Sequence, residues 1–150
     1  IVGLAKALQL RQADREIQSD KLISFRDHLI DQVLQKIPDS RLTGHPTKRL
    51  PNHASFVFKG VDGNALLMTL DLAGFACSSG SACKTGNPEP SEVLVALGIP
   101  TQWALGSLRV SLGIHTTFEE IEAFVNHLPG LIEQNRSLVA SDLQNQVIDE

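Results

Sequence analysis

The segment from Ser78 to Pro90 constrains the fold more than any other, because its thirteen successive residues include no large apolar side chain. A segment with so little to bury is predicted to run over the surface as a loop. Loops of this length in compact domains are usually functional or disordered. Gly80 and Gly86 permit backbone angles that other residues avoid, so this loop can fold sharply or swing.

Cys83 lies in the middle of this loop, and its small neighbours leave the sulfur atom uncrowded. Lys84 follows it, and a neighbouring cation raises the thiolate fraction of a cysteine. The residues alone leave two interpretations open: a reactive thiol, and a surface cysteine without a role. A phosphate-binding loop is disfavoured, because the nearest candidate, from Gly74 to Ser81, lacks both the spacing and the lysine of that motif.

Length and composition limit the class of protein. A chain of 150 residues suits one domain, and a net charge of −4 argues against nucleic acid as a partner. No apolar run reaches the roughly 18 residues of a membrane helix, and no signal peptide is recognised. Two cysteines do not make a disulfide framework, which favours a reducing compartment and a cytoplasmic location. Neither Cys-x-x-Cys nor His-x-x-x-His occurs, so a structural zinc site has little support.

The first half of the chain is predicted to form a helical region, a strand and a second helix. Apolar residues at spacings of three and four predict helix over residues 1–37, with a break between 11 and 20 and an end at Pro38. Alternation over 54–59 predicts a half-buried strand. Asp62 is positioned to cap a helix that ends at Gly74.

Phe75, Ala76 and Cys77 are predicted to form a short buried strand that leads into the loop. We expect Cys77 to be a small core residue, since apolar surroundings raise the pKa of a thiol. After the loop, Ser91 and Thr101 are candidate caps of two short helices.

Residues 107–112 alternate and predict a third strand, in which Leu108, Val110 and Leu112 face the core. Arg109 therefore faces away from the core. A lone arginine on a polar strand face is usually only solvated. Guanidinium is nevertheless well suited to bind a carboxylate, through two parallel hydrogen bonds.

The last helix is predicted to begin at a capping box of Thr117 and Glu120, and Pro129 should kink it or split it. A frayed helix or disorder is expected over residues 137–150. We expect three histidines to be structural or solvated rather than catalytic, namely His45, His53 and His115.

Several motifs in one order resemble the group I (NifS/IscS-like) cysteine desulfurases. Ser78-Ser79-Gly80-Ser81-Ala82-Cys83 resembles the segment that carries their active cysteine. The resemblance covers roughly residues 1–135. Its other parts are Leu42-x-Gly44-His45-Pro46, Leu50-Pro51-Asn52, Gly60-Val61-Asp62-Gly63 with Leu66-Leu67, Glu89-Pro90-Ser91, Val93-Leu94-x-Ala96-Leu97-Gly98, Ser107-Leu108-Arg109-Val110-Ser111-Leu112-Gly113 and Thr116-Thr117-x-Glu119-Glu120-Ile121.

The resemblance implies an α/β fold, with a short, mainly antiparallel sheet packed against helices as in the C-terminal domain of the type I pyridoxal-phosphate transferases of aminotransferase class V. Residues 1–37 would form interdomain helices, and 38–136 a small domain with the active-site loop at 78–90. Residues 137–150 would be a frayed tail. The chain opens on Ile1 without a methionine, and we expect it to belong to a longer protein.

The resemblance also implies a reaction. Pyridoxal 5'-phosphate would activate L-cysteine, the Cys83 thiolate would attack the substrate sulfur, and a persulfide and alanine would result. Arg109 would bind the substrate carboxylate. The loop would then carry the persulfide to a sulfur-acceptor or iron–sulfur scaffold protein. The resemblance also implies that the full-length protein would be a homodimer.

One departure from the family pattern limits what this chain does alone. The cofactor lysine of the family follows a histidine, and none of the six lysines does so here: Lys6, Lys21, Lys36, Lys48, Lys59 and Lys84. Lys84 also replaces a residue that is often a small hydroxyl residue in the family. We therefore expect no desulfurase activity from this chain alone, and a pyridoxal-independent persulfide carrier or a purely structural domain are the alternatives.

Overall fold

The computed structural model describes residues 1–13, 15–80 and 90–148, apart from the side chains of residues 11, 13 and 142–148. Its elements are α1 (Val2–Ala13), α2 (Arg15–Lys36), β1 (Ser40–Leu42), β2 (His53–Phe58), α3 (Gly63–Leu72), α4 (Glu92–Ala96), α5 (Thr101–Ala104), β3 (Ser107–Ser111) and α6 (Phe118–Ile148). The strands form one antiparallel sheet in the order β1-β2-β3. This confirms the mixed α/β prediction with a short antiparallel sheet.

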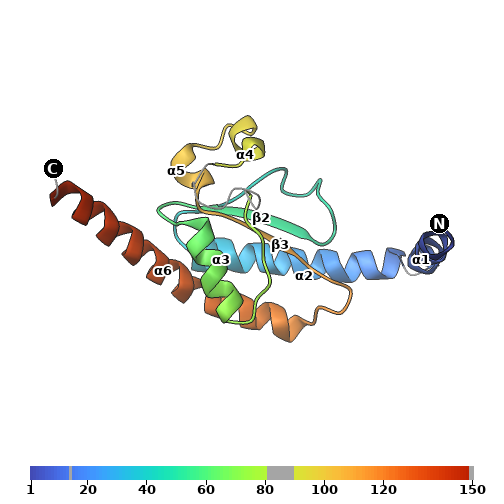
Figure 1. The fold of residues 1–150 in the computed structure, drawn as a ribbon. Coiled ribbons are helices and arrows are strands. Elements are labelled where there is room, and N and C mark those ends of the chain that lie inside the picture. Colours follow the sequence, from blue (N-terminus) through green and yellow to red (C-terminus); the bar gives the residue numbers. More distant parts are fainter. Residues whose placement is uncertain (14, 81–89, 149–150) are drawn as a thin grey trace.

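The sheet lies between two unequal layers of helices (Figure 1). The helices α2, α3 and α6 cover one face, where Phe56, Leu108 and Leu128 are fully buried in the main core. The short helices α4 and α5 lie over part of the other face, where Val57 packs with Leu94 and Trp103. Successive side chains of a strand alternate between these two faces, so the second face is left partly open.

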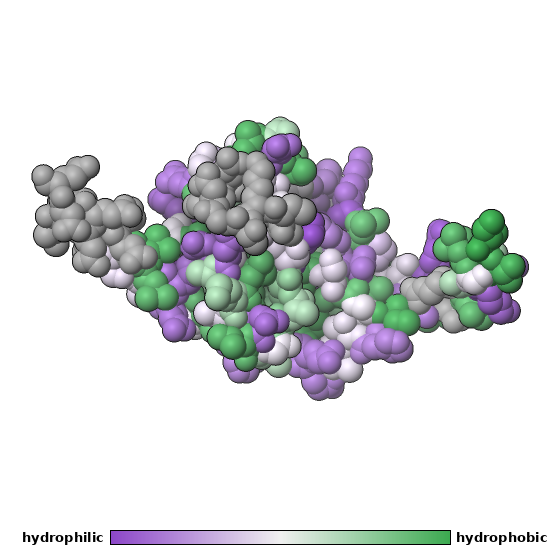
Figure 2. Space-filling model, in the orientation of Figure 1, coloured by the Kyte–Doolittle hydropathy of each residue, from purple (hydrophilic) through white to green (hydrophobic). Residues whose placement is uncertain are grey.

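In the N-terminal region α1 ends at Ala13 and α2 begins at Arg15, and the residue between them, inside the range where a break is predicted, lies outside the described residues. The second helix ends at Lys36, two residues before Pro38, and Asp39 adopts a positive φ of 53°. Helix α1 projects from the end of α2 (Figure 1), and the apolar side chains of Ile1, Leu4 and Leu8 are exposed on it. Figure 2 shows hydrophobic surface at that end of the molecule.

Two predicted caps are confirmed. The Asp62 carboxylate accepts the backbone N–H groups of Asn64 at 2.8 Å and Ala65 at 3.2 Å, and α3 is followed by Gly74 at a φ of +86°. The capping box of α6 is complete, because Thr117 N donates to Glu120 at 3.0 Å and Glu120 N donates to Thr117 Oγ1 at 3.2 Å. Both helices therefore begin where local chemistry satisfies their first N–H groups.

The prediction of a buried strand at residues 75–77 is wrong. These residues have irregular backbone, Phe75 and Cys77 are half-buried, and Ala76 is exposed. The ladder pairing begins one residue later, where Ser78 forms an isolated antiparallel bridge with Arg109. A run of three apolar residues cannot distinguish a strand from a covering segment, because packing rather than periodicity decides between them.

The C-terminal helix is one element. Of the two outcomes predicted for Pro129, the split does not occur, because α6 runs from Phe118 to Ile148 and includes most of the residues expected to fray. Leu128 and Ile132, on either side of Pro129, are almost completely buried. Their packing outweighs the hydrogen bond that proline removes.

Three smaller differences concern the loops and the short helices. Strand β1 pairs with β2, although the sequence patterns predict no strand at its position. The Ser91 side chain makes no capping hydrogen bond to α4, and Pro100 rather than Thr101 precedes α5. No helix in the described part of the chain is both long and apolar enough to cross a bilayer.

Candidate functional site

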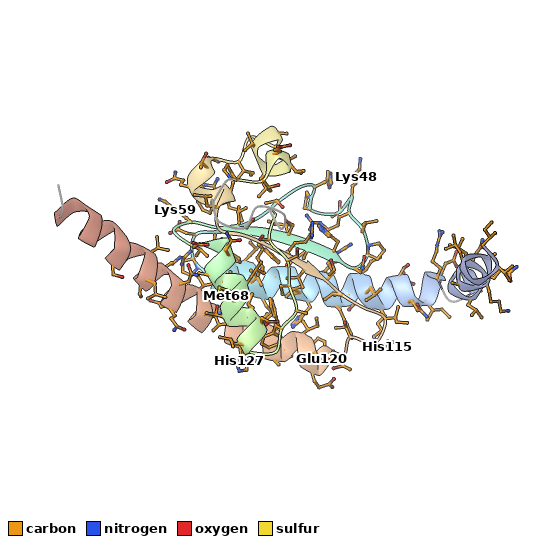
Figure 3. The ribbon with its side chains drawn as sticks, viewed as in Figure 1. Lys48, Lys59, Met68, His115, Glu120 and His127 are labelled. Atoms are coloured by element: carbon orange, nitrogen blue, oxygen red, sulfur yellow. The ribbon has the colours of Figure 1, made fainter. Side chains whose placement is uncertain are left out.

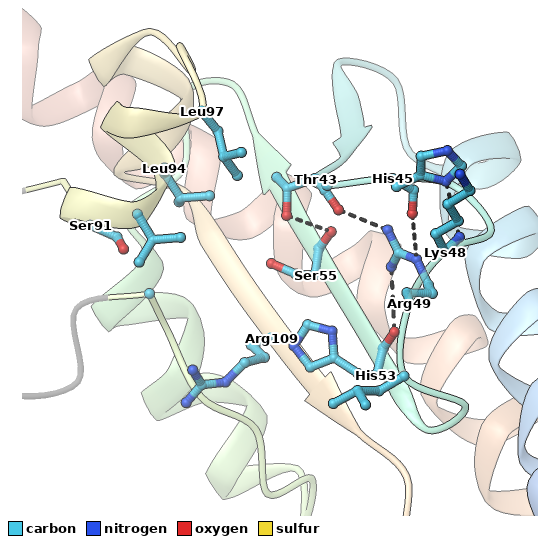
Figure 4. Close-up of a pocket in the computed structure, with 14 residues that line it drawn as sticks. Thr43, His45, Lys48, Arg49, His53, Ser55, Ser91, Leu94, Leu97 and Arg109 are labelled. Atoms are coloured by element: carbon cyan, nitrogen blue, oxygen red, sulfur yellow. Dashed lines mark hydrogen bonds between the residues drawn. The ribbon is translucent and has the colours of Figure 1, made fainter.

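Arg109 lies where the alternation of its strand predicts. It pairs with Ser55 across β2 and β3, and its exposed side chain is on the face opposite Leu108 and Val110, which are buried. This face of the sheet contains a hollow of about 360 Å³, which we call the polar hollow (Figure 4). Arg109 is one of the residues that line it.

The polar hollow combines cationic and apolar groups. Its lining is formed by Thr43, Gly44, His45, Lys48, Arg49, Leu50, His53, Ser55, Gly80, Ser91, Val93, Leu94, Leu97 and Arg109. These described lining residues include no Asp or Glu, and neither of the ion pairs found between described residues involves Arg109. A concave site with several cations and no acid among its described walls suits an anionic group such as a carboxylate.

Arg49 has a structural role in this lining. Its guanidinium donates to three backbone carbonyl oxygens, those of His45 at 3.0 Å, Thr43 at 2.8 Å and His53 at 3.4 Å (Figure 4). These bonds hold the connection between β1 and β2 against the start of β2. Arg49 therefore fixes the wall of the hollow, a role that the sequence analysis did not identify.

The two histidines of the hollow differ in their environment. His45 Nδ1 accepts the backbone N–H groups of Thr47 at 3.1 Å and Lys48 at 3.0 Å, so its ring closes a turn. The pKa of His53 is lowered from its ordinary value, first because burial disfavours the charged form and then because Arg49 and Arg109 are close. His53 is thus disposed to remain neutral beside Arg109.

Ser78 contacts Arg109 through both backbone and side chain. Ser78 N donates to Arg109 O at 3.1 Å, Arg109 N donates to Ser78 O at 2.6 Å, and Arg109 Nη2 donates to Ser78 Oγ at 3.0 Å. The start of the predicted loop is therefore bonded to the strand that carries Arg109. The sequence analysis missed this contact; the only available signal was the position of Ser78 at the head of the cysteine motif.

The predicted nucleophile, Cys83, lies outside the described residues. Cys77, in contrast, is described, and it lines a second hollow of about 350 Å³ with apolar residues such as Leu29, Phe75 and Phe124. We call this the apolar hollow. Burial raises the pKa of Cys77 to about 11, so this thiol stays protonated at neutral pH. That agrees with a packing role for Cys77, although the residue is half-buried rather than fully enclosed.

The described residues do not complete a site for pyridoxal phosphate. Among the described residues that line the polar hollow, the one lysine, Lys48, is exposed, and no carboxylate is present to pair with a pyridinium nitrogen. Lys48 and Lys59 extend outward at separate places on the surface (Figure 3). The described part of the chain also contains no group of three or more His, Cys, Asp or Glu residues that could hold a metal ion.

Solved structures share this arrangement of sheet and helices. A NifS-like protein superposes with a TM-score of 0.75 over 88% of this chain and 33% of its own, at 22% sequence identity, a likeness that shows the fold alone. A NifS-like protein from Rickettsia africae gives a TM-score of 0.70 over 83% of this chain and 31% of its own, at 27% identity. The fold is that of part of a NifS-like protein.

Sequence comparison defines the family. The family model described as aminotransferase class V matches residues 1–124, and this chain belongs to that family. Cysteine desulfurase IscS of Methanosarcina thermophila is 41% identical over 92% of this chain, and cysteine desulfurase IscS 1 of Archaeoglobus fulgidus is 40% identical over 92%. The chain spans only 34% and 36% of these two relatives, about a third of their length.

Proposed function

We propose that this chain is the C-terminal part of a cysteine desulfurase, to which it contributes the sulfur nucleophile and the carboxylate clamp. The observation that carries the proposal is the position of Arg109, exposed in a cationic hollow and bonded to the base of the segment that leads to Cys83. Relatives at 40% and 41% identity are named cysteine desulfurases, which supports the same assignment.

The clamp follows from the chemistry of the lining. A guanidinium presents pairs of parallel N–H groups that match the two oxygens of a carboxylate. With neutral His53 beside it and no acid among the described walls, Arg109 is available to the carboxylate of L-cysteine. Binding there would orient the substrate relative to the loop that carries Cys83.

The Cys83 thiolate would then attack the sulfur atom of L-cysteine, the carbon–sulfur bond of the substrate would break, and Cys83 persulfide and alanine would result. Full-length members of this family imply pyridoxal 5'-phosphate as the cofactor, and its site would lie in a segment beyond this chain. We therefore expect the chain alone to form no specific lysine imine with pyridoxal phosphate and to show no desulfurase activity. A stoichiometric adduct that borohydride traps would contradict this expectation.

The wider setting of the reaction also belongs to this proposal. An iron–sulfur scaffold or another sulfur-acceptor protein would receive the persulfide sulfur, the full-length enzyme would be a homodimer, and its location would be cytoplasmic. Residues 1–37 would connect the domains and 38–136 would form the small domain.

The proposal is tested by the intact mass of the full-length enzyme after brief incubation with L-cysteine. Wild type should gain the mass of about one sulfur atom, which a reductant removes, and Cys83→Ser should gain none. Cys77→Ser is the matched control and should gain as much as wild type. An equal gain in wild type and Cys83→Ser would place the nucleophile elsewhere.

A persulfide carrier that works without pyridoxal phosphate is the second candidate. It is favoured by the incomplete cofactor site among the described residues of this chain. The purified chain, given a small persulfide donor without cofactor, would then load sulfur on Cys83 and pass it to a thiol acceptor. A chain that gains no sulfur under these conditions excludes the carrier.

A further inference from the structure

The guanidinium of Arg109 is exposed, and an exposed arginine side chain normally samples several rotamers. A carboxylate clamp works best when its direction is set before the substrate arrives. We propose that Ser78 is a positioning residue that sets the direction of the Arg109 guanidinium toward the carboxylate of L-cysteine. This inference rests on the role proposed above for Arg109.

The geometry that carries this inference is an antiparallel bridge. Ser78 and Arg109 exchange both backbone hydrogen bonds, at 3.1 and 2.6 Å, so their Cα atoms are held opposite each other. Side chains of directly opposed residues lie on the same face of a sheet. The Ser78 hydroxyl is therefore presented to Arg109, whose Nη2 donates to it at 3.0 Å.

Ser78 itself is held in place by the residues that follow it. Two residues on, Gly80 N donates to Ser107 Oγ at 3.0 Å, which fastens the segment to β3 a second time. A side chain at position 80 would meet Ser91 Cβ at 2.8 Å, so only glycine permits this close approach. These contacts therefore hold the Ser78 hydroxyl in a fixed position beside β3.

The bond leaves the guanidinium able to bind a carboxylate. The group has two edges that each present a pair of parallel N–H bonds, and the two hydrogens of Nη2 belong to different edges. A single bond from Nη2 to Ser78 therefore orients the plane and occupies one edge, while the other pair stays available. A hydroxyl does this without neutralising the cation, whereas an acid at position 78 would compete with the substrate.

The test is a double-mutant cycle on the full-length enzyme, with KM for L-cysteine and kcat measured for each variant. Ser78→Ala should raise KM about 3- to 10-fold, as expected for one partly exposed hydrogen bond to a charged group, and change kcat less than about 2-fold. In an Arg109→Ala background the same change should raise KM no further. Ser78→Thr, which keeps the hydroxyl, should restore the wild-type KM.

Two more variants sharpen the result. Ser78→Asp should raise KM more than Ser78→Ala does, because its carboxylate would occupy Arg109. Ser111→Ala, a change of an exposed serine two residues further along β3, is the matched control and should leave KM unchanged. Thermal denaturation of every variant shows whether it is folded. If Ser78→Ala does not fold, the KM values of Ser78→Thr and Ser78→Asp are compared instead.

The outcomes separate this inference from the proposed function. If Ser78→Ala raises KM by the same factor in the wild-type and Arg109→Ala backgrounds, or if it lowers only kcat, Ser78 does not act through Arg109. An unchanged KM in Arg109→Ala would overturn the clamp itself, and the Ser78 inference with it. Absence of desulfurase activity in the wild-type enzyme would instead refute the proposed function.

Discussion

Two hollows of nearly equal volume, about 360 and 350 Å³, lie on opposite faces of β3 and have opposite chemistry. Arg109 faces the polar hollow, and its neighbour Val110 faces the apolar one. The same division occurs at the adjacent segment, where Cys77 lines the apolar hollow and Ser78 bonds to Arg109. The volume of a cavity therefore indicates little about its role, whereas the charge and hydrogen-bond capacity of its walls indicate much.

The two hollows should also contribute differently to the stability of the fold and to ligand binding. The apolar hollow borders the main core, since Leu29, Ile121 and Phe124 belong to both. The polar hollow is lined largely by exposed or half-buried residues that the core does not need. Changes in the first hollow should therefore mainly affect the free energy of unfolding, and changes in the second should mainly affect ligand affinity.

The largest effect is expected for Phe124→Ala in the apolar hollow. Phe124 is 5% exposed and contacts Phe75 edge to face, with ring centroids 5.3 Å apart. Its loss should lower the free energy of unfolding by about 3 kcal/mol, measured by denaturant titration of the chain. Met68→Ala, a change of an exposed residue on α3, is the control and should cost less than about 0.5 kcal/mol. A cost below about 1 kcal/mol for Phe124→Ala would mean that this wall supports little of the core.

The second largest effect is expected in the reactivity of the Cys77 thiol, which should be lower in the folded chain. Its pKa of about 11 lies two units above the ordinary 9.0, so the thiolate fraction near pH 8 should be about 100-fold lower than in an unfolded peptide. Alkylation of Cys77, followed by peptide mass spectrometry, should be slower by that factor in the folded chain. Equal rates before and after unfolding would show that the apolar hollow does not protect the thiol.

The next effect is expected for Arg109→Ala in the polar hollow. Loss of a charge-assisted carboxylate contact should lower kcat/KM for L-cysteine about 10- to 100-fold in the full-length enzyme. The free energy of unfolding should change by less than about 0.5 kcal/mol, since the side chain is exposed. A large loss of stability with little change in kcat/KM would reverse the contrast between the two hollows.

The smallest effect concerns the pH dependence of the polar hollow. The folded pKa of His53 is below its ordinary value of 6.5, so the unfolded chain binds this proton more tightly than the folded chain does. The His53 contribution to stability is therefore present above pH 6.5 and is lost as the pH falls through the folded pKa. An NMR titration of the His53 ring should show a midpoint below 6.5 that rises in Arg109→Ala. A midpoint that Arg109→Ala leaves unmoved would mean that burial alone lowers the pKa.

Local chemistry made several parts of the fold predictable. Asp62 and Gly74 mark the two ends of α3, and Thr117 and Glu120 mark the start of α6, because capping involves residues only a few positions apart. Predictions failed where distant contacts decided the outcome. Residues 75–77 cover an apolar hollow instead of joining the sheet. Of the kink or split predicted at Pro129, the split does not occur, because the residues on either side of it are buried.

The sequence by itself determined the family, the antiparallel α/β class and the face on which Arg109 lies, because motif order and a period of two are properties of the chain. Only the tertiary structure decided what surrounds Arg109. Ser78 is 31 residues away in sequence, yet its hydroxyl accepts a hydrogen bond from the guanidinium. Arg49 and His53 reach the same hollow from the connection before β2 and from its first residue. Such pairings depend on strand register and packing, which bring distant residues together and which no local spacing encodes.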